Sequence, residues 1–282
     1  METCRRRAEG MIERRQSLLM DFFTFQELVF HTVVREVRHE NSRNPVVGLF
    51  MAASRTLLMV GIFYVMFEVL GARSAMIRGD AVLYLVSGFL LFFLHVGAIS
   101  GVLASGSSVG ALQQHAPVTP ALMIVAGAIK QLYLHVFALG VILLGLFVFK
   151  GEIDVYNWGG LIAPFMLTWL SGVSIGLLFL GVKPFAPDLV KLLATVYQRA
   201  NFFTSGKFFV ANMLPAAVIP FFAWNPLFHC IDQMRGAMFV NYVPQNSNLE
   251  YPTIFCAVGL VIGMMLEFFT RKTVSRSSAH SR

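Results

Sequence analysis

The stretch AVLYLVSGFLLFFLHVGAISGVLAS, from Ala81 to Ser105, decides the fold of this chain because it contains no charged residue. The absence of Asp, Glu, Lys and Arg continues as far as Ile129. A helix needs about 20 predominantly apolar residues to cross the ~30 Å hydrocarbon layer of a membrane. The stretch therefore predicts a transmembrane helix, and a second helix begins before the uncharged run ends.

The same lack of charge marks the rest of the chain. Of the 282 residues, 56% are hydrophobic and 13% are charged, and further uncharged runs cover 155–182 and 208–231. A soluble domain carries about 25% charged residues. We therefore predict an all-α polytopic membrane protein. Six segments are predicted to span the membrane, with turns rich in glycine and proline between them: 46–70, 81–105, 121–149, 157–182, 189–212 and 251–270.

The N-terminal region has a different pattern. Residues 1–20 are polar and basic, as expected of a cytoplasmic tail. Over 21–44, apolar residues such as Val29 and Val33 recur at spacings of three and four, and charged residues occupy the opposite side. This pattern predicts an amphipathic helix that ends before Pro45 and lies at the cytoplasmic interface of the membrane.

Basic residues are concentrated at both ends of the chain. Eight of the 22 Lys and Arg residues precede Pro45, and four lie in the segment 271–282. Lys and Arg next to membrane spans are retained on the cytoplasmic side. Both termini are therefore expected in the cytoplasm, with 271–282 as a cytoplasmic tail and the transmembrane domain, 46–270, between the two basic ends.

The segment 214–242 does not fit a simple crossing. It contains Pro215, Pro220 and Pro226, too many for one continuous helix. A further crossing here would also place the basic C-terminal tail outside the cytoplasm. We therefore expect a re-entrant segment on the periplasmic side, between the fifth and sixth spans. Irregular backbone at membrane depth is tolerated where protein or a water-filled cavity covers it, so this segment is a candidate for function.

The sequence lacks the motifs of an enzyme. It contains no GxxxxGK[ST] P-loop, no HExxH and no GxSxG. Cys4, Cys230 and Cys256 are scattered, without the spacing of metal ligands. We expect no catalytic residue, metal or cofactor in this chain, and no binding of ATP through a P-loop.

Charged residues inside the predicted spans are a better lead, because each costs about 2.5–3.5 kcal/mol at the centre of the membrane. Arg199 and Lys207 lie about two turns apart in the predicted fifth span and are expected to share a helix face. Phe202 and Phe203 lie between them, and Trp224 follows in the re-entrant segment. One interpretation is a basic and aromatic path for an anionic, ring-bearing substrate. The other is ion pairing with neighbouring helices together with ordinary aromatic packing.

Glycines at a spacing of four recur on two predicted spans. Gly97 and Gly101 share one face of the second span, and Gly172 and Gly176 share one face of the fourth. Small residues allow helix backbones to approach closely. The close contact is predicted either within one subunit or between two copies.

Taken in order, several short motifs resemble the type-2 ABC exporter permeases that move capsular polysaccharide and O-antigen, most closely the capsule-export branch. The resemblance extends from about Phe25 to Lys272. One position departs from the family pattern, because Arg55 stands where an acidic residue is usual, which we interpret as a contact with a differently charged substrate or with lipid. The motifs are VREVR (34–38) with Gly48, PVTP (117–120), LTW (167–169), FFTSG (202–206), Leu214-Pro215, and WNPL (224–227) with His229, Arg235 and Tyr251.

The resemblance implies a homodimer in the bacterial inner membrane, paired with two copies of a separate cytoplasmic ATPase that binds the ATP. It implies a lipid-linked polysaccharide as substrate, which periplasmic co-polymerase-type and outer-membrane export proteins would carry onward. The residues expected to face the ATPase are Arg35, Glu36, Arg38 and Pro117, and those expected along the substrate path are Arg55, Arg199, Phe202, Phe203, Lys207 and Trp224.

Three other functions remain open at this point. The same fold could export another lipid-linked polymer, such as O-antigen or teichoic acid. A membrane-embedded transferase would need a catalytic acid or base near the interface, and the sequence shows no such cluster. A structural scaffold would leave the proline-rich segment unexplained. A Walker-motif ATPase encoded beside this chain would favour the exporter.

Cysteine-accessibility labelling tests the predicted topology. Asn246→Cys should react with a membrane-impermeant thiol reagent in intact inner-membrane vesicles of right-side-out orientation, because it follows the re-entrant segment. Ser278→Cys should react only after the membrane is opened, because the basic tail is retained inside. Labelling of Ser278→Cys from the periplasmic side would contradict the predicted topology.

Overall fold

The computed structural model describes residues 26–34, 45–69, 80–112, 119–151 and 153–280. Within these ranges the regular structure is helical, and no strand is present. The elements are α2 (Pro45–Val69), α3 (Ala81–Leu112), α4 (Pro120–Lys150), η2 (Gly159–Leu161), α5 (Ile162–Val182), α6 (Pro187–Thr204), η3 (Ala211–Met213), α7 (Pro220–Ala223), α8 (Pro226–Met238) and α9 (Glu250–His280).

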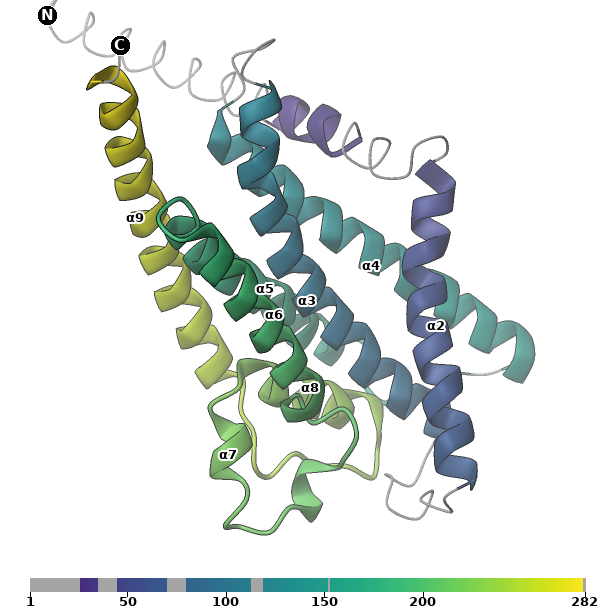
Figure 1. The fold of residues 1–282 in the computed structure, drawn as a ribbon. Helices are drawn as coiled ribbons and strands as arrows, with labels where there is room; N and C mark the ends of the chain where they lie inside the picture. Colours follow the sequence, from purple (N-terminus) through teal and green to yellow (C-terminus); the bar gives the residue numbers. More distant parts are fainter. Residues whose placement is uncertain (1–25, 35–44, 70–79, 113–118, 152, 281–282) are drawn as a thin grey trace, which may run out of the picture.

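The long helices alternate in direction (Figure 1). Helices α2, α4 and α6 run from the upper to the lower end of the view, and α3, α5 and α9 run back. The helix over residues 26–34 and the last turns of α9 lie at the upper end, which we call the tail end. The opposite end, where Lys150 pairs with Asp80 and where α7 and α8 lie, is called the cap end.

Five helices of the described part are long and apolar enough to cross a membrane. They coincide with five of the six predicted spans: Leu49–Val69, Ala81–Gly106, Pro120–Lys150, Gly159–Val182 and Glu250–Thr273. The predicted segment 189–212 differs from the structure, since α6 ends at Thr204. Helix α6 also carries Asp188, Lys191 and Arg199, so it is more polar than the other five. A sixth crossing stays a prediction.

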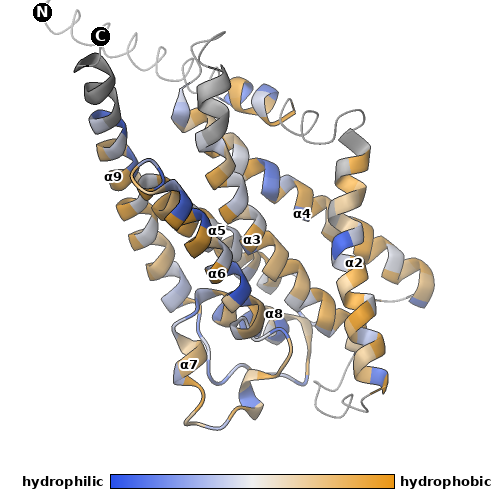
Figure 2. Ribbon diagram, in the orientation of Figure 1, coloured by the Kyte–Doolittle hydropathy of each residue, from blue (hydrophilic) through white to orange (hydrophobic). Residues whose placement is uncertain are grey.

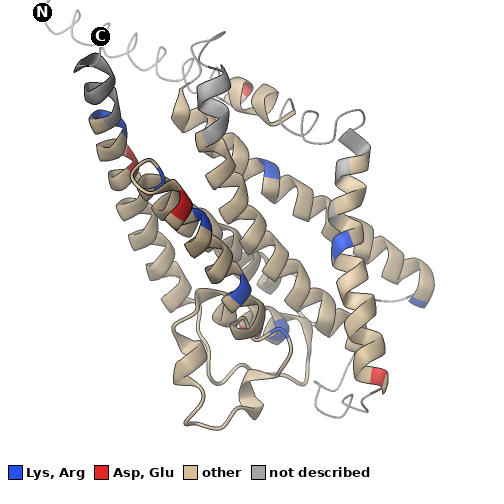
Figure 3. Cartoon of the chain, in the orientation of Figure 1, with Lys and Arg blue, Asp and Glu red and all other residues tan. Residues whose placement is uncertain are grey.

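Helix α3 is the centre of the bundle. It contacts α2, α4, α5 and α8, and Leu85, Leu91 and Leu94 have no exposed surface. The outer helices expose apolar side chains instead: Leu144 of α4 is 64% exposed and Met264 of α9 is 56% exposed. Figure 2 shows apolar residues around the long helices, and Figure 3 shows how sparse the charges are on them. Helices that are hydrophobic all round span membranes or form cores, so the described part is a polytopic helical membrane protein.

The helix over residues 26–34 lies against α4. Val29 and Val33 are buried there against Leu122 and Ala126. The rest of the predicted helix 21–44 lies outside the described residues, and so do Arg35, Glu36, Arg38 and Pro117. Its interfacial position and its role toward an ATPase stay predictions.

The glycines predicted to mediate close helix contacts do so within one chain. A β carbon on Gly101 of α3 would lie 2.7 Å from the Gly127 carbonyl oxygen of α4. A β carbon on Gly172 of α5 would lie 2.5 Å from the His95 carbonyl oxygen of α3. Gly97 and Gly176 are enclosed in the same way by α4 and α3 side chains and backbone. Of the two predicted alternatives, the structure places these contacts inside the subunit.

Gly127→Ala is expected to lower the midpoint of thermal unfolding in detergent. The new methyl group would lie 2.6 Å from the Gly101 carbonyl oxygen and would force α3 and α4 apart. Overpacking of this kind costs about 1–3 kcal/mol. Gly140→Ala on the same helix is the matched control, because nothing lies within 4 Å of its added β carbon and alanine favours a helix over glycine. Equal midpoints for the two variants would contradict the close crossing.

Candidate functional site

The candidate site is the cap, residues 205–249, which joins α6 to α9 at the cap end of the bundle (Figure 1). Two of its prolines start helices: Pro220 opens α7 and Pro226 opens α8. Proline fits a first helical turn because its missing N–H would have no partner there. The prediction that no single helix covers this segment is confirmed. Its depth in a membrane stays a prediction.

Helix α8 is held beneath the bundle at both ends. At its start, the Asn225 side chain accepts a hydrogen bond from the Leu227 N–H at 3.0 Å and donates to the Asn201 side chain of α6 at 2.8 Å. At its end, the carbonyls of Ala237 and Met238 accept bonds from the chain just before α5. Every residue from 226 to 232 is buried. The polar groups of α8 therefore face protein.

Arg235 of α8 is buried against backbone carbonyls. Only 1% of its surface is exposed. One guanidinium nitrogen donates to the carbonyls of Gly206 at 2.8 Å and Phe209 at 2.9 Å, and the other donates to the Lys207 carbonyl at 2.8 Å. The Tyr84 ring of α3 lies over the guanidinium, 3.8 Å from Cζ to the ring centroid. Carbonyl dipoles and an aromatic face thus take the place of an acidic partner.

Two glycines allow the turn after α6 to lie between α3 and α8. Gly206 has φ +79, a left-handed conformation that favours glycine. Gly88 of α3 faces this turn, because a β carbon there would lie 2.7 Å from the Lys207 Cβ. The close approach brings the Lys207 side chain against the phenylalanine rings of α3.

Lys207 lies in an aromatic cage, which we define as Phe89, Phe92, Phe202 and Phe208. The side chain has no exposed surface. Its Nζ lies 3.3 Å from the ring centroid of Phe92 and 3.6 Å from that of Phe202, and has no hydrogen-bond partner among the described residues. Ring faces attract a cation within about 6 Å of the centroid. Burial lowers the pKa of Lys207 to about 6, and the ring faces oppose this shift because they attract the charged form. Among the described residues, its Nζ has no acidic partner.

A second polar cluster closes the loop after α8. The Asp232 carboxylate, 2% exposed, accepts hydrogen bonds from the hydroxyl of Tyr242 and from that of Ser247, the latter at 2.7 Å. The Gln233 side chain donates to the Ser247 carbonyl at 2.9 Å. Burial first, and then the neighbouring carboxylate, raise the pKa of Tyr242 well above its ordinary value. Tyr242 is therefore a stable hydrogen-bond donor.

His229 holds α7 and the loop before α9 on opposite sides of one ring. Its Nε2 donates to the Ala223 carbonyl at 2.8 Å, and its Nδ1 accepts the Asn248 N–H at 3.2 Å. One neutral tautomer makes both bonds. Burial lowers the pKa of His229, which agrees with the neutral form, and the bond to Ala223 opposes this shift. The Tyr251 hydroxyl adds a bond to the Trp224 carbonyl.

The structure separates the two basic residues that were predicted to share a helix face. Because α6 ends at Thr204 and Gly206 turns the chain, Lys207 lies beyond the helix. Arg199 is exposed on α6, whereas Lys207 is buried. The prediction of a shared face is wrong. The predicted alternative of ion pairing does not describe Lys207 either, because its contacts are aromatic.

The other residues predicted along the substrate path differ in their exposure and in their contact with the aromatic cage. Phe202 belongs to the cage, while Phe203 is 67% exposed and Trp224 is 51% exposed. Arg55 of α2 is exposed, and its Cζ lies 4.6 Å from the centroid of Phe93 on α3. Phe63 of α2 completes the contact with rings of Phe89, Phe202 and Phe208. Helices α2, α3 and α6 therefore meet through phenylalanine rings next to two cations.

Two residues of the cap received no role from the sequence. Arg235 was part of the family resemblance without an assigned function, and Asp232 was not singled out. The available signal was their position: Asp232 follows the uncharged run 208–231 directly, and Arg235 lies three residues later on the same helix. Their partners are carbonyls and hydroxyls from distant segments, which a sequence pattern does not reveal.

The described residues contain no group of three or more His, Cys, Asp or Glu side chains that could hold a metal ion. Cys230 and Cys256 are buried free thiols. The Arg235 guanidinium, the Asp232 carboxylate and the Lys207 side chain of the cap have backbone, hydroxyl and aromatic partners, respectively. Such an arrangement shapes a surface and places basic side chains within it.

Fold and site together define a multi-pass helical membrane protein with charged residues buried in a cap between its last two long helices. No protein-family model matches the chain. The sequence is similar to two proteins of Escherichia coli, each described as "Polysialic acid transport protein KpsM". The first is 27% identical over 222 residues, which cover 76% of this chain and 81% of the relative. The second is 25% identical over 184 residues, which cover 65% of this chain and 70% of the relative. These relatives confirm the resemblance to capsule-export permeases that the motifs indicated.

Substitution of the two buried basic residues by methionine is expected to have different effects on stability. Lys207→Met keeps an unbranched apolar chain in the cage and removes a buried amine that has no hydrogen-bond partner among the described residues, so the unfolding midpoint in detergent should stay or rise. Arg235→Met leaves three carbonyls without their donor, at about 1–3 kcal/mol each when buried, so the midpoint should fall. Arg199→Met, at an exposed position of α6, is the control and should change little. A fall for Lys207→Met as large as that for Arg235→Met would contradict the assignment of Lys207 to an aromatic cage without an anion.

Proposed function

We propose that this chain is the membrane permease subunit of an ATP-driven exporter that moves lipid-linked capsular polysaccharide across the bacterial inner membrane. The observation that carries the proposal is its similarity to two polysialic acid transport proteins over most of the chain. The apolar helices agree with a permease. The nature of the polymer is taken from the chemistry of the relatives' substrate, an anionic polysaccharide.

The permease would cross the membrane six times, with α6 as the fifth span. Its 18 residues extend about 27 Å, close to the ~30 Å hydrocarbon thickness. The alternating helix directions agree with an even number of crossings, since α2 starts and α9 ends at the tail end (Figure 1). The tail end would then be cytoplasmic. The cap would be the re-entrant, periplasmic part, with its backbone polar groups satisfied by protein as membrane depth requires.

The substrate path would pass the side of α6 and the cap that presents Arg199, Phe203 and Trp224. These side chains are exposed, and they combine one fixed positive charge with flat apolar rings. Positive charge attracts an anionic polymer, and rings offer contact without strong directional bonds. Arg55 would extend this surface across α2. Lys207 and Phe202 would support it from within, since Lys207 lies against the Phe202 ring and would add positive charge behind the path when it is protonated.

The remaining parts of the machine would be separate proteins. The permease would form a homodimer and bind two copies of a cytoplasmic ATPase, which would bind and hydrolyse the ATP. Arg35, Glu36, Arg38 and Pro117 would contact this ATPase from the tail end. Periplasmic co-polymerase-type and outer-membrane export proteins would receive the polymer at the cap end.

Replacement of both path cations tests the proposal. Arg199→Gln together with Lys207→Gln should reduce polysaccharide at the cell surface and cause polymer to accumulate inside the cell. The amount of permease in the membrane and its co-purification with the ATPase should not change. Lys191→Gln is the matched control, because Lys191 is exposed on the same helix but was not placed on the path.

Each outcome distinguishes a different part of the proposal. Normal surface polysaccharide in the double variant would contradict the assignment of the path. Normal surface polysaccharide after deletion of the gene would contradict export of this polymer altogether. Loss of the double variant from the membrane would show that the two cations are structural, which would also contradict their assignment to the path.

A further inference from the structure

Helices α4 and α5 are joined at one level and separate toward the cap end. The indole N–H of Trp169 on α5 donates to the Ala128 carbonyl of α4 at 2.9 Å. Ala128 and Val173 pack in the same apolar cluster at this level. Farther toward the cap end, α4 diverges from α5 (Figure 1). A wedge therefore opens between two helices that both pack on α3.

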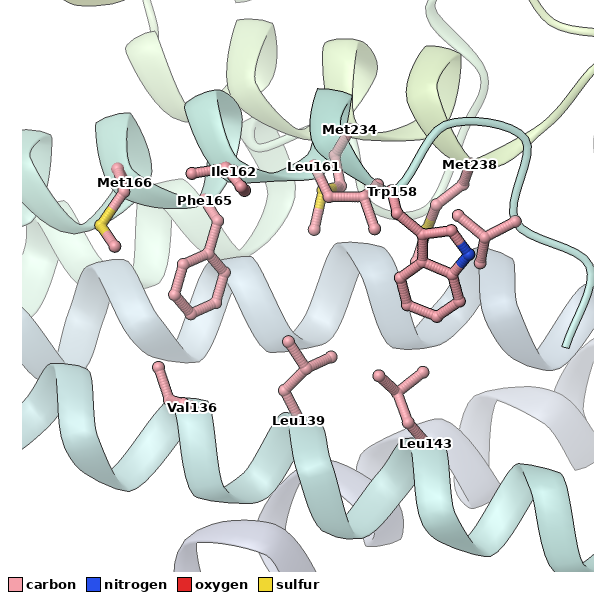
Figure 4. A pocket seen from close by; sticks show the side chains of 11 residues that line it. Val136, Leu139, Leu143, Trp158, Leu161, Ile162, Phe165, Met166, Met234 and Met238 are labelled. Atoms are coloured by element: carbon pink, nitrogen blue, oxygen red, sulfur yellow. The ribbon is translucent and has the colours of Figure 1, made fainter.

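The wedge holds a cavity of about 270 Å³. Leu139 and Leu143 of α4 point across it toward Phe165 of α5 and toward Trp158, which precedes η2 (Figure 4). Met234 and Met238 of α8 form its deep side. The residues that line it are apolar or aromatic, and the indole N–H of Trp158 is the one polar side-chain group among them.

The composition of the wall decides what the cavity can hold. Its volume equals that of about nine water molecules at ~30 Å³ each. A buried water needs two to four polar partners, and cavities lined by apolar side chains stay dry and accept apolar ligands. The occupant must therefore be apolar. Leucine and methionine side chains adapt to flexible occupants because they have several accessible rotamers.

The surroundings of the cavity place it in the outer part of a hydrocarbon layer. Leu144 on α4 and Ile162 on α5 flank it, 64% and 63% exposed, so its open side continues into an apolar surface. Tyr156 and Trp158, 64% and 52% exposed, lie at the cap end of the wedge. Tyrosine and tryptophan concentrate at the level of lipid headgroups. The cavity thus extends from headgroup level toward the membrane interior.

We propose that this cavity is a binding site for one acyl chain of a membrane phospholipid from the leaflet at the cap end. An acyl chain is apolar, unbranched and narrow, and it can enter sideways from the bilayer between α4 and α5. An α-helix is about 10–12 Å across with its side chains, so no helix of a partner or of a second copy fits the space. The headgroup would lie near Trp158 and the Lys150–Asp80 ion pair. The proposal does not depend on the transport function.

Photo-crosslinking with a lipid tests the site directly. The purified protein would be placed in nanodiscs of phosphatidylcholine that contain a small fraction of phosphatidylcholine with a diazirine in one acyl chain. After irradiation, peptide mapping should find label concentrated on residues 136–143 and 158–166. Residues 258–265 of α9 are the internal reference, because Val258, Val261 and Met264 are more than half exposed and line no part of this cavity. Equal label on α9 and on the wedge would overturn the proposal.

Variants that fill the cavity make the test specific. Leu143→Trp should reduce label on 158–166 at least by half, because the indole occupies the space between α4 and α5. Leu144→Trp, the adjacent residue on the exposed face, is the matched control and should leave the label unchanged. Label on 158–166 that is equal in both variants would overturn the proposal. A disulfide between two copies through Leu143→Cys would also overturn it, since the cavity would then be filled by a second subunit.

Discussion

The cap depends on the guanidinium of Arg235. It binds three carbonyls of one short turn, at Gly206, Lys207 and Phe209, which no helix or strand would satisfy. Hydrogen bonds from a charged donor contribute about 1.5–3 kcal/mol each, and a buried carbonyl left unpaired costs about 1–3 kcal/mol. The turn and the arginine therefore require each other. Tyr84 of α3 covers the remaining face of the guanidinium, so the same residue fixes the turn, α8 and the central helix in one arrangement.

Lys207 shows how a membrane protein can bury a basic side chain without an acid. The turn that Arg235 fixes directs the Lys207 side chain away from solvent and into four phenylalanine rings. An acidic partner would cancel the charge and would itself need desolvation, which often costs more than the ion pair returns. Ring faces attract the ammonium form and replace part of its hydration, which opposes the lowering of the Lys207 pKa by burial. When Lys207 is protonated, its charge acts on an anion that passes nearby, because low-polarity surroundings screen it weakly.

The membrane spans could be predicted from the sequence because they depend on composition. The position of Lys207 could not be predicted because it depends on the turn after α6. Five spans follow from long apolar runs with few charges, because each charge in a span would cost several kcal/mol. The bounds of α2 and α4 agree closely with the predicted segments, whereas α3 continues to Leu112, beyond the predicted end at 105. The end of α6 at Thr204 could not be predicted from the sequence. Ser205 and Gly206 sit in an aromatic run whose pattern continues to Phe209, and the positive φ of Gly206 becomes favourable through Arg235, which lies 29 residues away. Lys207 could therefore be identified from the sequence as a basic residue that is costly to bury, but its aromatic cage could not.

The apolar wedge between α4 and α5 could not be predicted either. Its leucines and methionines have the same sequence pattern as residues that face lipid or a packed core.

Helix α8 connects the two features that the sequence did not reveal. Arg235 and Asp232 serve the cap, and Met234 and Met238 reach the wedge between α4 and α5. These residues alternate along one short helix of 13 residues, and a helix of this length moves as a unit because each turn is hydrogen-bonded to the next. A shift of α8 toward or away from the wedge would move the guanidinium relative to the carbonyls at 206–209, where bonds of 2.8–2.9 Å leave little tolerance. The lipid-facing side of the protein and the buried charges near α6 are therefore mechanically linked through α8, which makes the packing of the wedge a physical constraint on the geometry of the cap.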